Sequence, residues 1–371
     1  MPRIVFLTRG DASHGMGHLH RVSWLAAALL SQRRDNLAIS VQCLDSPQAW
    51  GFFAPHSPFV QTLRPLALAA TDVTFHESAD LMLSGLAAGD VVVVDWLDSP
   101  EEFATAARAI VAPDTPAPGT KPGALVLLDD YGPARQQAAL CINALLAPLE
   151  DSDSTANGTR VLSGAAYVQL PLSALRLRGV GQAKAKEAAT LLSGPAPKVG
   201  PVRMVLVSFG GSPKPELIHL ALNSLRLAGF NGKVIVMPAP VGGELPAPTD
   251  ASLSLDVEYH PAGDEFHDYM AGADLAILAG GLSLYEAAFF GVPAICVPLV
   301  EHQQSTALKL ERASCCRLAG MAGKVNAGQL AVKLKGLLGS ARLRGRMSYH
   351  GMRLIDGRGL QRTADAILDL L

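Results

Sequence analysis

The segment from Ala273 to Gln304 contains a glycine pair and a carboxylate with the spacing of a nucleotide site. Gly280 and Gly281 follow a short apolar run, and helical spacing of apolar residues begins at Leu282. The start of a helix presents unpaired N–H groups and the positive end of the helix dipole, and glycines let an anion approach closely. Glu286, about one turn into this helix, could accept hydrogen bonds from a ribose diol. The pattern predicts a nucleotide diphosphate site, with a simple strand-to-helix turn as the alternative.

A second segment with candidate chemistry begins the chain. Residues 3–7 are an apolar run suited to a buried parallel strand, and residues 8–18 form a polar, glycine-rich loop. An alanine-leucine helix then runs to about Arg33, so His18 and Arg21 lie near its start. In an open α/β sheet this loop is the usual place for a nucleotide. The glycines at 10, 15 and 17 do not have the dinucleotide spacing G-x-G-x-x-G.

Carboxylates follow two other apolar runs. Residues 91–94 are followed by Asp95 and Trp96, and residues 124–128 by Asp129 and Asp130. Active-site loops of α/β sheets lie at the carboxyl ends of the strands, so these carboxylates are candidates for chemistry. Helix N-capping is an equally weighted alternative for the pair at 129 and 130.

The remaining pattern predicts two α/β domains with their loops facing a common cleft, residues 1–192 and 193–371. A Pro/Gly/Ser run at 193–197 is the expected linker. A glycine loop at 208–212 has the same design as the pair at 280–281. Further strands are expected at 38–44, 204–207, 234–236 and 293–297, and further helices at 77–88, 101–111, 184–192, 215–227, 327–338, 341–352 and 360–370.

Composition excludes several classes of protein. The chain has 371 residues, 49% of them hydrophobic, and a formal net charge of −2, which argues against a general nucleic-acid binder. Five cysteines without Cys-x-x-Cys spacing indicate neither a disulfide framework nor a zinc site. We expect a cytoplasmic protein without a signal peptide or an integral membrane segment, and the oligomeric state stays open.

Two polar segments have weaker interpretations. The Asp-x-Asp at residues 151–153 matches a metal-binding pattern of sugar transferases, but it lies in a polar stretch, 150–158, that we expect to be a surface loop without metal. A run of arginines near the C-terminus is expected to be a solvated helix face, with a phosphate or membrane-surface role as the alternative. The run consists of Arg342, Arg344, Arg346, Arg353, Arg358 and Arg362.

Six motifs in order resemble one known family. The first loop, RGDASHGMGHLHR, resembles the Arg-x-Asp-Ala-Ser … Gly-x-Gly-His-x-x-Arg signature of the UDP-sugar hydrolases of pseudaminic acid biosynthesis (PseG) and their spore-coat polysaccharide relatives (SpsG). The other five motifs are VVVVDW, LVLLDDYGPARQQAALCINALL, VLVSFGGS, ILAGGLSLYEAAFFGVPAICVPLVEHQ and DGRGLQR. The resemblance spans nearly the whole chain.

The resemblance implies the GT-B fold, two Rossmann-like domains with an interdomain cleft, which is shared with the transferase MurG. The second domain would hold the UDP-sugar substrate, and the N-terminal loop would face the sugar. No cofactor or metal is needed if helix dipoles and backbone amides carry the diphosphate charge. The implied substrate-binding residues are Gly15, Gly17, Arg21 and Asp95 in the first domain, and Gly210, Gly211, Ser212, Gly280, Gly281, Ser283, Glu286, Glu301, Gln303 and Gln304 in the second.

The resemblance also assigns the chemistry to His18. It would activate water for attack on the anomeric carbon, which displaces UDP with inversion, and Asp11 would orient the imidazole. An imidazole suits this task because its ordinary pKa, about 6.5, lies near working pH. A capping or packing role is the alternative for His18. An inverting glycosyltransferase, in which His18 deprotonates an acceptor hydroxyl, is the second functional hypothesis, and a catalytically silent nucleotide-sugar-binding protein is the third.

Three departures from the family pattern leave the sugar and any acceptor open. Trp96 stands where the family commonly has Tyr, and an indole can neither act as an acid nor accept a hydrogen bond. His302 replaces the Asn of a Glu-Asn-Gln motif. The chain also has extra length at 113–122, 150–158 and 181–201.

Overall fold

The computed structural model consists of two compact units. It describes residues 1–10, 17–32, 37–46, 73–96, 98–119, 121–145, 152–156, 158–177, 201–210, 215–237, 255–261 and 265–371. Unit 1 comprises Met1–Pro171 together with Gly357–Leu371, and unit 2 comprises Leu172–Asp356. The predicted boundary at 192/193 lies outside the described residues. That boundary therefore stays a prediction, while the contacts of the chain divide it at Leu172 and place the last fifteen residues in unit 1.

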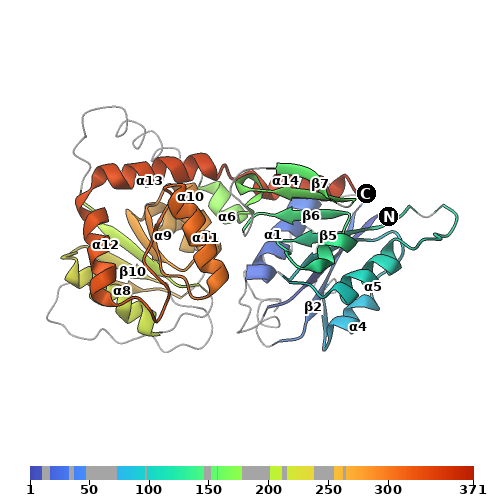
Figure 1. Ribbon diagram of the computed structural model, residues 1–371, viewed down its shortest axis with the longest axis horizontal. Coiled ribbons are helices and arrows are strands. Elements are labelled where there is room, and N and C mark those ends of the chain that lie inside the picture. The colour runs from blue at the N-terminus through green and yellow to red at the C-terminus, as the bar shows by residue number, and fades with distance from the viewer. Residues whose placement is uncertain are drawn as a thin grey trace. The chain divides into compact units, whose positions relative to one another are not determined.

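Unit 1 is built on an eight-stranded sheet with the strand order β3-β2-β1-β4-β5-β6-β8-β7 (Figure 1). Its central strands are apolar and buried, as expected of parallel strands covered on both faces. All neighbours pair in parallel except β7 and β8, which are antiparallel. The strands are β1 (Arg3–Thr8), β2 (Ala38–Leu44), β3 (Val73–His76), β4 (Val91–Asp95), β5 (Ala124–Leu128), β6 (Leu140–Asn143), β7 (Ser152–Ala156) and β8 (Thr159–Ser163).

Two predictions for unit 1 are wrong in detail. The stretch expected to be a loop, 150–158, contains the edge strand β7, because its polar residues pair with β8 through backbone groups. The helix expected at 77–88 is limited to α4 (Ala79–Leu83). It ends early because the following residues form turns, in which Arg3 donates to the Gly85 carbonyl and the Ala87 N–H donates to Asp90.

The helices of unit 1 include one from each end of the chain. They are α1 (Gly17–Gln32), α4, α5 (Glu101–Val111) and α14 (Gly359–Leu368), with the 3-10 turns η3 (Pro133–Gln137) and η4 (Ala165–Tyr167). Helix α14 packs on α1 and on η4. A Cβ at Gly359 would lie 2.1 Å from the Val168 carbonyl oxygen, and Arg362 donates to the Ala166 carbonyl at 2.9 Å. This close packing explains why α14 joins unit 1.

Unit 2 is a six-stranded parallel sheet flanked by helices, with the order β11-β10-β9-β12-β13-β14. The strands are β9 (Met204–Ser208), β10 (Lys233–Val236), β11 (Asp256–Tyr259), β12 (Leu275–Leu278), β13 (Ala294–Cys296) and β14 (Arg317–Leu318). The helices are α6 (Leu172–Arg176), α8 (Pro215–Leu227), α9 (Phe266–Gly272), α10 (Leu282–Phe290), α11 (Glu301–Arg312), α12 (Ala327–Gly339) and α13 (Ala341–Leu354). Its core joins the sheet to α8 and α12.

Both sheets reverse their strand order at one place. The reversal lies between β1 and β4 in unit 1 and between β9 and β12 in unit 2. Ligands of open α/β sheets bind outside the carboxyl ends of the strands at such a reversal. The prediction of two Rossmann-like domains is confirmed. No helix in the described part of the chain is both long and apolar enough to cross a bilayer.

Candidate functional site

The reversal in unit 1 brings a histidine against a buried carboxylate. Asp95 is the last residue of β4, and His18 lies in the first turn of α1. His18 Nδ1 lies 2.7 Å from Asp95 Oδ1, while the Asp95 side chain is fully buried and the His18 side chain is 13% exposed. A carboxylate on one ring nitrogen sets the orientation and tautomer of an imidazole. Nε2 is therefore the nitrogen available for proton transfer.

Arg21, one turn further along α1, connects this pair to a second carboxylate. Its Nε donates to Asp95 Oδ2 at 2.7 Å, and its two Nη atoms donate to Asp95 and to Asp129. Burial lowers the pKa of Arg21, but the charges of the two carboxylates outweigh burial and raise it. For Asp95 the effect of burial is the opposite, because burial raises the pKa of a carboxyl group. The positive charges of Arg21 and His18 outweigh burial and hold the pKa of Asp95 at about 2. Asp95 is thus a permanent carboxylate that orients His18.

Asp129 and Asp130 have different roles at the end of β5. Asp129 is buried with a φ of 49°, and its Oδ1 accepts from the N–H groups of Ala144 and Leu145 at 2.7 and 2.8 Å. It therefore connects the ends of β5 and β6 to the Arg21 network. Asp130 accepts from the Ser99 and Gly132 N–H groups, each at 2.9 Å, and holds the loop after β4.

Several buried polar atoms at this sheet edge have no hydrogen-bond partner in the described structure, and three of them lie at the centre of the sheet. They are Thr8 Oγ1, Trp96 Nε1 and Asn143 Oδ1, at the ends of β1, β4 and β6. Because buried polar groups are nearly always paired, polar groups of a ligand are natural partners for them. Neither Thr8 nor Asn143 was predicted as a site residue, although Asn143 lies in the motif LVLLDDYGPARQQAALCINALL. The signal that could have found them is their position as the last residues of strands.

In unit 2 the glycines follow neighbouring strands. Gly210 follows β9 with a φ of 79°, a left-handed conformation that favours glycine. Gly280 and Gly281 follow β12, and no side chain caps α10 at Gly281. A Cβ at Gly280 would lie 2.5 Å from the Gln303 carbonyl oxygen, so this glycine permits close packing of α11, whereas the Cβ position of Gly281 is open.

Glu286 is buried in α10 and is held by a second histidine. His267 Nε2, from α9, lies 3.1 Å from Glu286 Oε1, and His267 Nδ1 lies 2.9 Å from Ser173 Oγ on α6. His267 therefore binds one of the two carboxylate oxygens of Glu286. No sequence motif points to His267 or Ser173, because residues far apart in the chain meet only through the fold.

The start of α11 completes this edge. Gln303 Oε1 accepts from the Leu299 N–H at 2.9 Å, so its side chain folds back on the residues just before α11. Glu301 is exposed and Gln304 is partly buried in the first turn of the helix, and Ser283 is partly buried at the start of α10.

The structure divides the predicted site residues into two groups. His18, Arg21 and Asp95 lie together in unit 1, where Gly17 begins α1. The second-domain residues that are described lie around the starts of α10 and α11 and the end of β9 in unit 2. Asp11, Gly15, Gly211 and Ser212 lie outside the described residues. Within the described ranges, no group of three or more His, Cys, Asp and Glu side chains is placed to hold a metal ion.

The second unit matches a known domain family. Residues 205–335 match the glycosyltransferase family 28 C-terminal domain, a span that begins in β9 and ends in α12. The match assigns this part of unit 2, and not the whole chain, to the family 28 domain.

A curated relative extends the resemblance. The chain is 29% identical over 175 residues to the spore coat polysaccharide biosynthesis protein SpsG of Bacillus subtilis strain 168. The match covers 45% of this chain and 50% of the relative, so the chain spans about half the length of that relative. Together with the domain match, this confirms the predicted resemblance to the PseG and SpsG proteins.

Solved structures with the same fold match the whole chain. MurG of Acinetobacter baumannii has a TM-score of 0.58 at 12% identity, and all of both chains is covered. The calicheamicin glycosyltransferase CalG4 has a TM-score of 0.59 at 16% identity, with 100% of this chain and 98% of CalG4 covered. The kitacinnamycin glycotransferase has a TM-score of 0.59 at 14% identity, with both chains fully covered. These likenesses establish the GT-B fold.

Proposed function

We propose that this protein cleaves the anomeric C1–O bond of a UDP-activated amino sugar with water, in the biosynthesis of a surface glycan or nonulosonic acid. The hydrogen-bonded pair of His18 and Asp95 at the reversal of the unit 1 sheet carries the proposal. The substrate class rests on the family 28 domain and on the SpsG relative.

His18 acts as the general base in the proposed reaction. A water molecule gives a proton to His18 Nε2 while its oxygen attacks C1 of the sugar. The C1–O bond breaks with inversion, and its electron pair leaves with the β-phosphate oxygen of UDP. Asp95 stabilises the imidazolium that forms, because its low pKa keeps it ionised. The products are UDP and the free sugar.

Unit 2 holds the nucleotide in this proposal. The diphosphate binds at the uncapped start of α10, where the open position of Gly281 leaves room for an anion. Glu286 accepts hydrogen bonds from the ribose hydroxyls, and His267 fixes the carboxylate for that task. The charge of the diphosphate is neutralised by backbone N–H groups and the helix dipole.

An inverting glycosyltransferase is the second candidate, favoured by the glycosyltransferase description of the matching domain. The same residues serve this reaction, in which His18 takes the proton of an acceptor hydroxyl instead of water. The nucleophile is the only chemical difference.

One experiment separates the two reactions. The purified protein is incubated with a panel of UDP-sugars, with and without cell extract as a source of acceptors, and both UDP and free sugar are quantified. Stoichiometric free sugar and UDP without extract support hydrolysis. UDP release only with extract supports transfer, and no UDP release under either condition contradicts both.

A further inference from the structure

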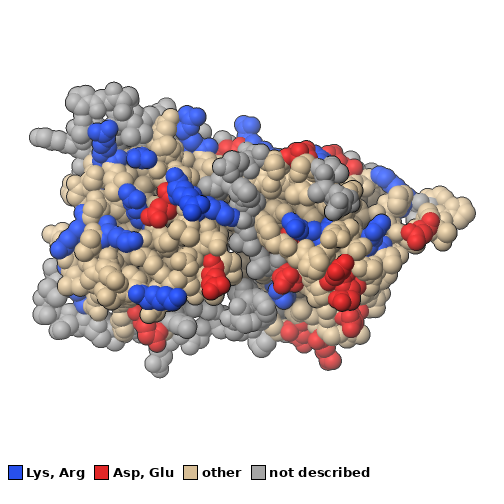
Figure 2. Space-filling model, in the orientation of Figure 1, with Lys and Arg blue, Asp and Glu red and all other residues tan. Residues whose placement is uncertain are grey.

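Unit 2 carries a concentration of positive charge that the proposed reaction does not use. Between Lys309 and Asp356 the sequence contains ten lysine and arginine residues but only two acidic residues, Glu311 and Asp356, in a chain whose formal net charge is −2. Figure 2 shows Lys and Arg side chains spread widely over the visible face of this unit. Such a local surplus indicates an anionic partner.

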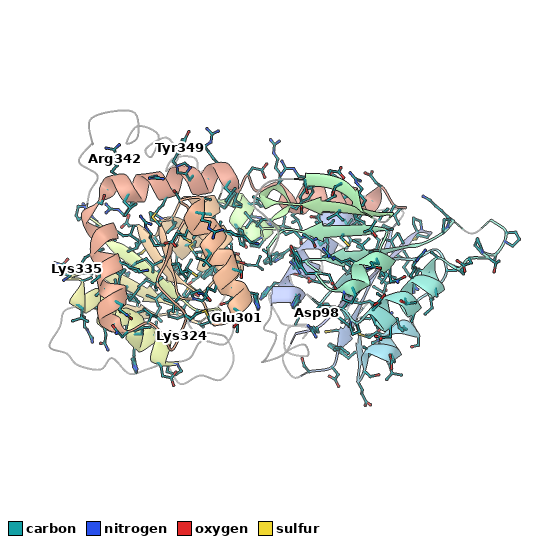
Figure 3. The ribbon with its side chains drawn as sticks, in the orientation of Figure 1. Asp98, Glu301, Lys324, Lys335, Arg342 and Tyr349 are labelled. Atoms are coloured by element: carbon teal, nitrogen blue, oxygen red, sulfur yellow. The ribbon has the colours of Figure 1, made fainter. Side chains whose placement is uncertain are left out.

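Helix α13 presents part of this charge as a stripe. Arg342, Arg346, Tyr349 and Arg353 are spaced by four, three and four residues, which places them on one side of the helix. The three arginines are exposed, whereas the opposite side of α13 is buried and packs on α10. Helix α13 contains no acidic residue. Figure 3 shows Arg342 and Tyr349 on the outer side of the helix.

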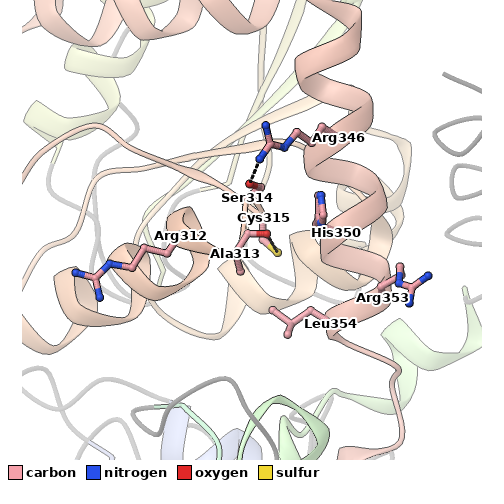
Figure 4. Close-up of a pocket in the computed structure, with 8 residues that line it drawn as sticks. All are labelled: Arg312, Ala313, Ser314, Cys315, Arg346, His350, Arg353 and Leu354. Carbon is pink, nitrogen blue, oxygen red and sulfur yellow. Dashed lines mark hydrogen bonds between the residues drawn. The ribbon is translucent and has the colours of Figure 1, made fainter. Parts of the chain in front are cut away.

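An open depression of about 500 Å³ lies between this helix and the end of α11. Its lining includes Arg312, Arg346, His350 and Arg353, and none of its lining residues is acidic. Arg346 donates to Ser314 Oγ at 3.0 Å, while Arg312 and Arg353 extend outward on opposite sides (Figure 4). The guanidinium groups are therefore spread over a surface instead of converging on one point.

This arrangement favours an extended anionic surface over a single phosphate. From Arg342 to Arg353 the stripe runs eleven residues, about 16 Å along the helix. The guanidinium of Arg353 stacks 5.5 Å from the centre of the Tyr349 ring and donates to its hydroxyl at 3.0 Å. Tyrosine beside arginine is suited to a membrane interface, where an apolar ring and a polar tip are both accommodated.

We propose that this basic face of unit 2, formed by Arg312, Arg342, Arg346, Tyr349, His350 and Arg353, docks on an anionic phospholipid surface. The arginines pair with headgroup phosphates, and Tyr349 lies at the headgroup level. Binding is peripheral and electrostatic, so it weakens as salt increases.

The test is sedimentation of the full chain with lipid vesicles. Vesicles of two parts phosphatidylcholine to one part phosphatidylglycerol are compared with pure phosphatidylcholine vesicles. Binding is expected only to the mixed vesicles, and the R346Q/R353Q variant is expected to bind about thirtyfold more weakly. The matched control, K324Q/K335Q, removes the same charge from side chains that lie away from the stripe in Figure 3, and it is expected to bind like the wild type.

Turnover of soluble UDP-sugar without vesicles is expected to be the same in both variants and the wild type, which separates docking from catalysis. Equal binding to both vesicle types, or no binding to the mixed vesicles, contradicts the proposal. A loss of vesicle binding in K324Q/K335Q that equals the loss in R346Q/R353Q also contradicts the proposal. Release of the protein from the mixed vesicles by inorganic phosphate, but not by chloride of the same ionic strength, would instead identify a soluble phosphate ligand. Duplex DNA binding that depends on Arg346 and Arg353, without vesicle binding, would identify a polynucleotide partner.

Discussion

The two nitrogens of His18 have separate tasks in this site. Asp95 binds Nδ1, and in the proposed reaction Nε2 takes a proton from the nucleophile. From the sequence, Asp11 was one candidate for the carboxylate that orients His18, and Asp95 was expected to contact the substrate. Asp11 lies outside the described residues, and the oxygens of Asp95 are bound by His18 and Arg21. In the proposed reaction, Asp95 therefore acts on the substrate through His18.

Replacing His18 with Ala tests its role as base. We expect turnover of the UDP-sugar to fall at least about a hundredfold, while the Kd for UDP changes little, because the base is needed only for the chemical step. Turnover is measured by UDP release and affinity by calorimetry. His20→Ala, an exposed position on the same helix, is the control and is expected to retain turnover. Full activity of the His18 variant would remove it from the mechanism.

Asp95 gives the folded protein a pH-dependent stability. Its pKa in the folded protein is about 2, below the ordinary value of 3.8. The ionised form is therefore favoured by folding, so the stabilisation is complete above pH 3.8 and is lost as the pH falls toward 2. Asp95→Asn, which takes one carboxylate from the buried Arg21, is expected to lower the free energy of unfolding by roughly 3–5 kcal/mol at pH 7.

Urea unfolding at a series of pH values measures this effect. The difference between wild type and Asp95→Asn is expected to narrow below pH 3.8. Asp153→Asn, which breaks an exposed pair with Arg160, is the control and is expected to change the unfolding midpoint little. A difference between wild type and Asp95→Asn that stays constant down to pH 2 would rule out the proposed linkage.

The proposed contact between Glu286 and the ribose hydroxyls is tested by replacing Glu286 and by removing a ribose hydroxyl. We expect Glu286→Ala to weaken UDP binding about tenfold or more, because a charged hydrogen-bond acceptor is lost. Wild type is also expected to prefer UDP over 2′-deoxy-UDP, and the variant is expected to bind both equally. Calorimetry with the two ligands measures this. Glu216→Ala, an exposed glutamate on α8, is the control. A variant that still prefers UDP would place the ribose elsewhere.

At the scale of elements, glycine determines how closely α13 crosses α10. A Cβ at Gly351 would lie 2.8 Å from the Ala288 carbonyl oxygen and 2.9 Å from its Cα, whereas no atom lies within 4 Å of a Cβ at Gly336 on α12. We expect Gly351→Ala to destabilise the protein by about 1–3 kcal/mol through overpacking. Gly336→Ala is expected to stabilise it by about 0.5–1 kcal/mol. Urea midpoints compare the two, and equal effects would contradict the close crossing.

Strongly patterned elements could be predicted from the sequence, and short edge elements could not. The bounds of β2, β5, α5 and α8 agree with the prediction, because apolar runs and helical periodicity are strong where both faces or one full face are buried. The strand β7 was missed because it lies at the sheet edge with a polar sequence. The shortened α4 reflects turn contacts with the nearby Asp90 and with Arg3, which is distant in the chain and which no local pattern encodes.

At the scale of the whole molecule, the sequence predicted the two-domain GT-B fold but not the division of the chain. Repeated strand-glycine-helix units indicate two α/β domains. The return of α14 to unit 1 depends on packing at η4 that only the fold creates. The site was predicted in part: His18, Asp95 and Glu286 have motif signals, whereas the pairing of Asp95 with His18 and the contact of His267 with Glu286 are identified by geometry.

The central claim is attack at the anomeric carbon by a nucleophile that His18 activates. Turnover of the preferred UDP-sugar in ¹⁸O-labelled water, followed by mass spectrometry of the released UDP, tests it most directly. Unlabelled UDP is expected, because the bond that breaks joins C1 to the bridging oxygen. Label in the β-phosphate of UDP would show attack at phosphorus and would contradict the account.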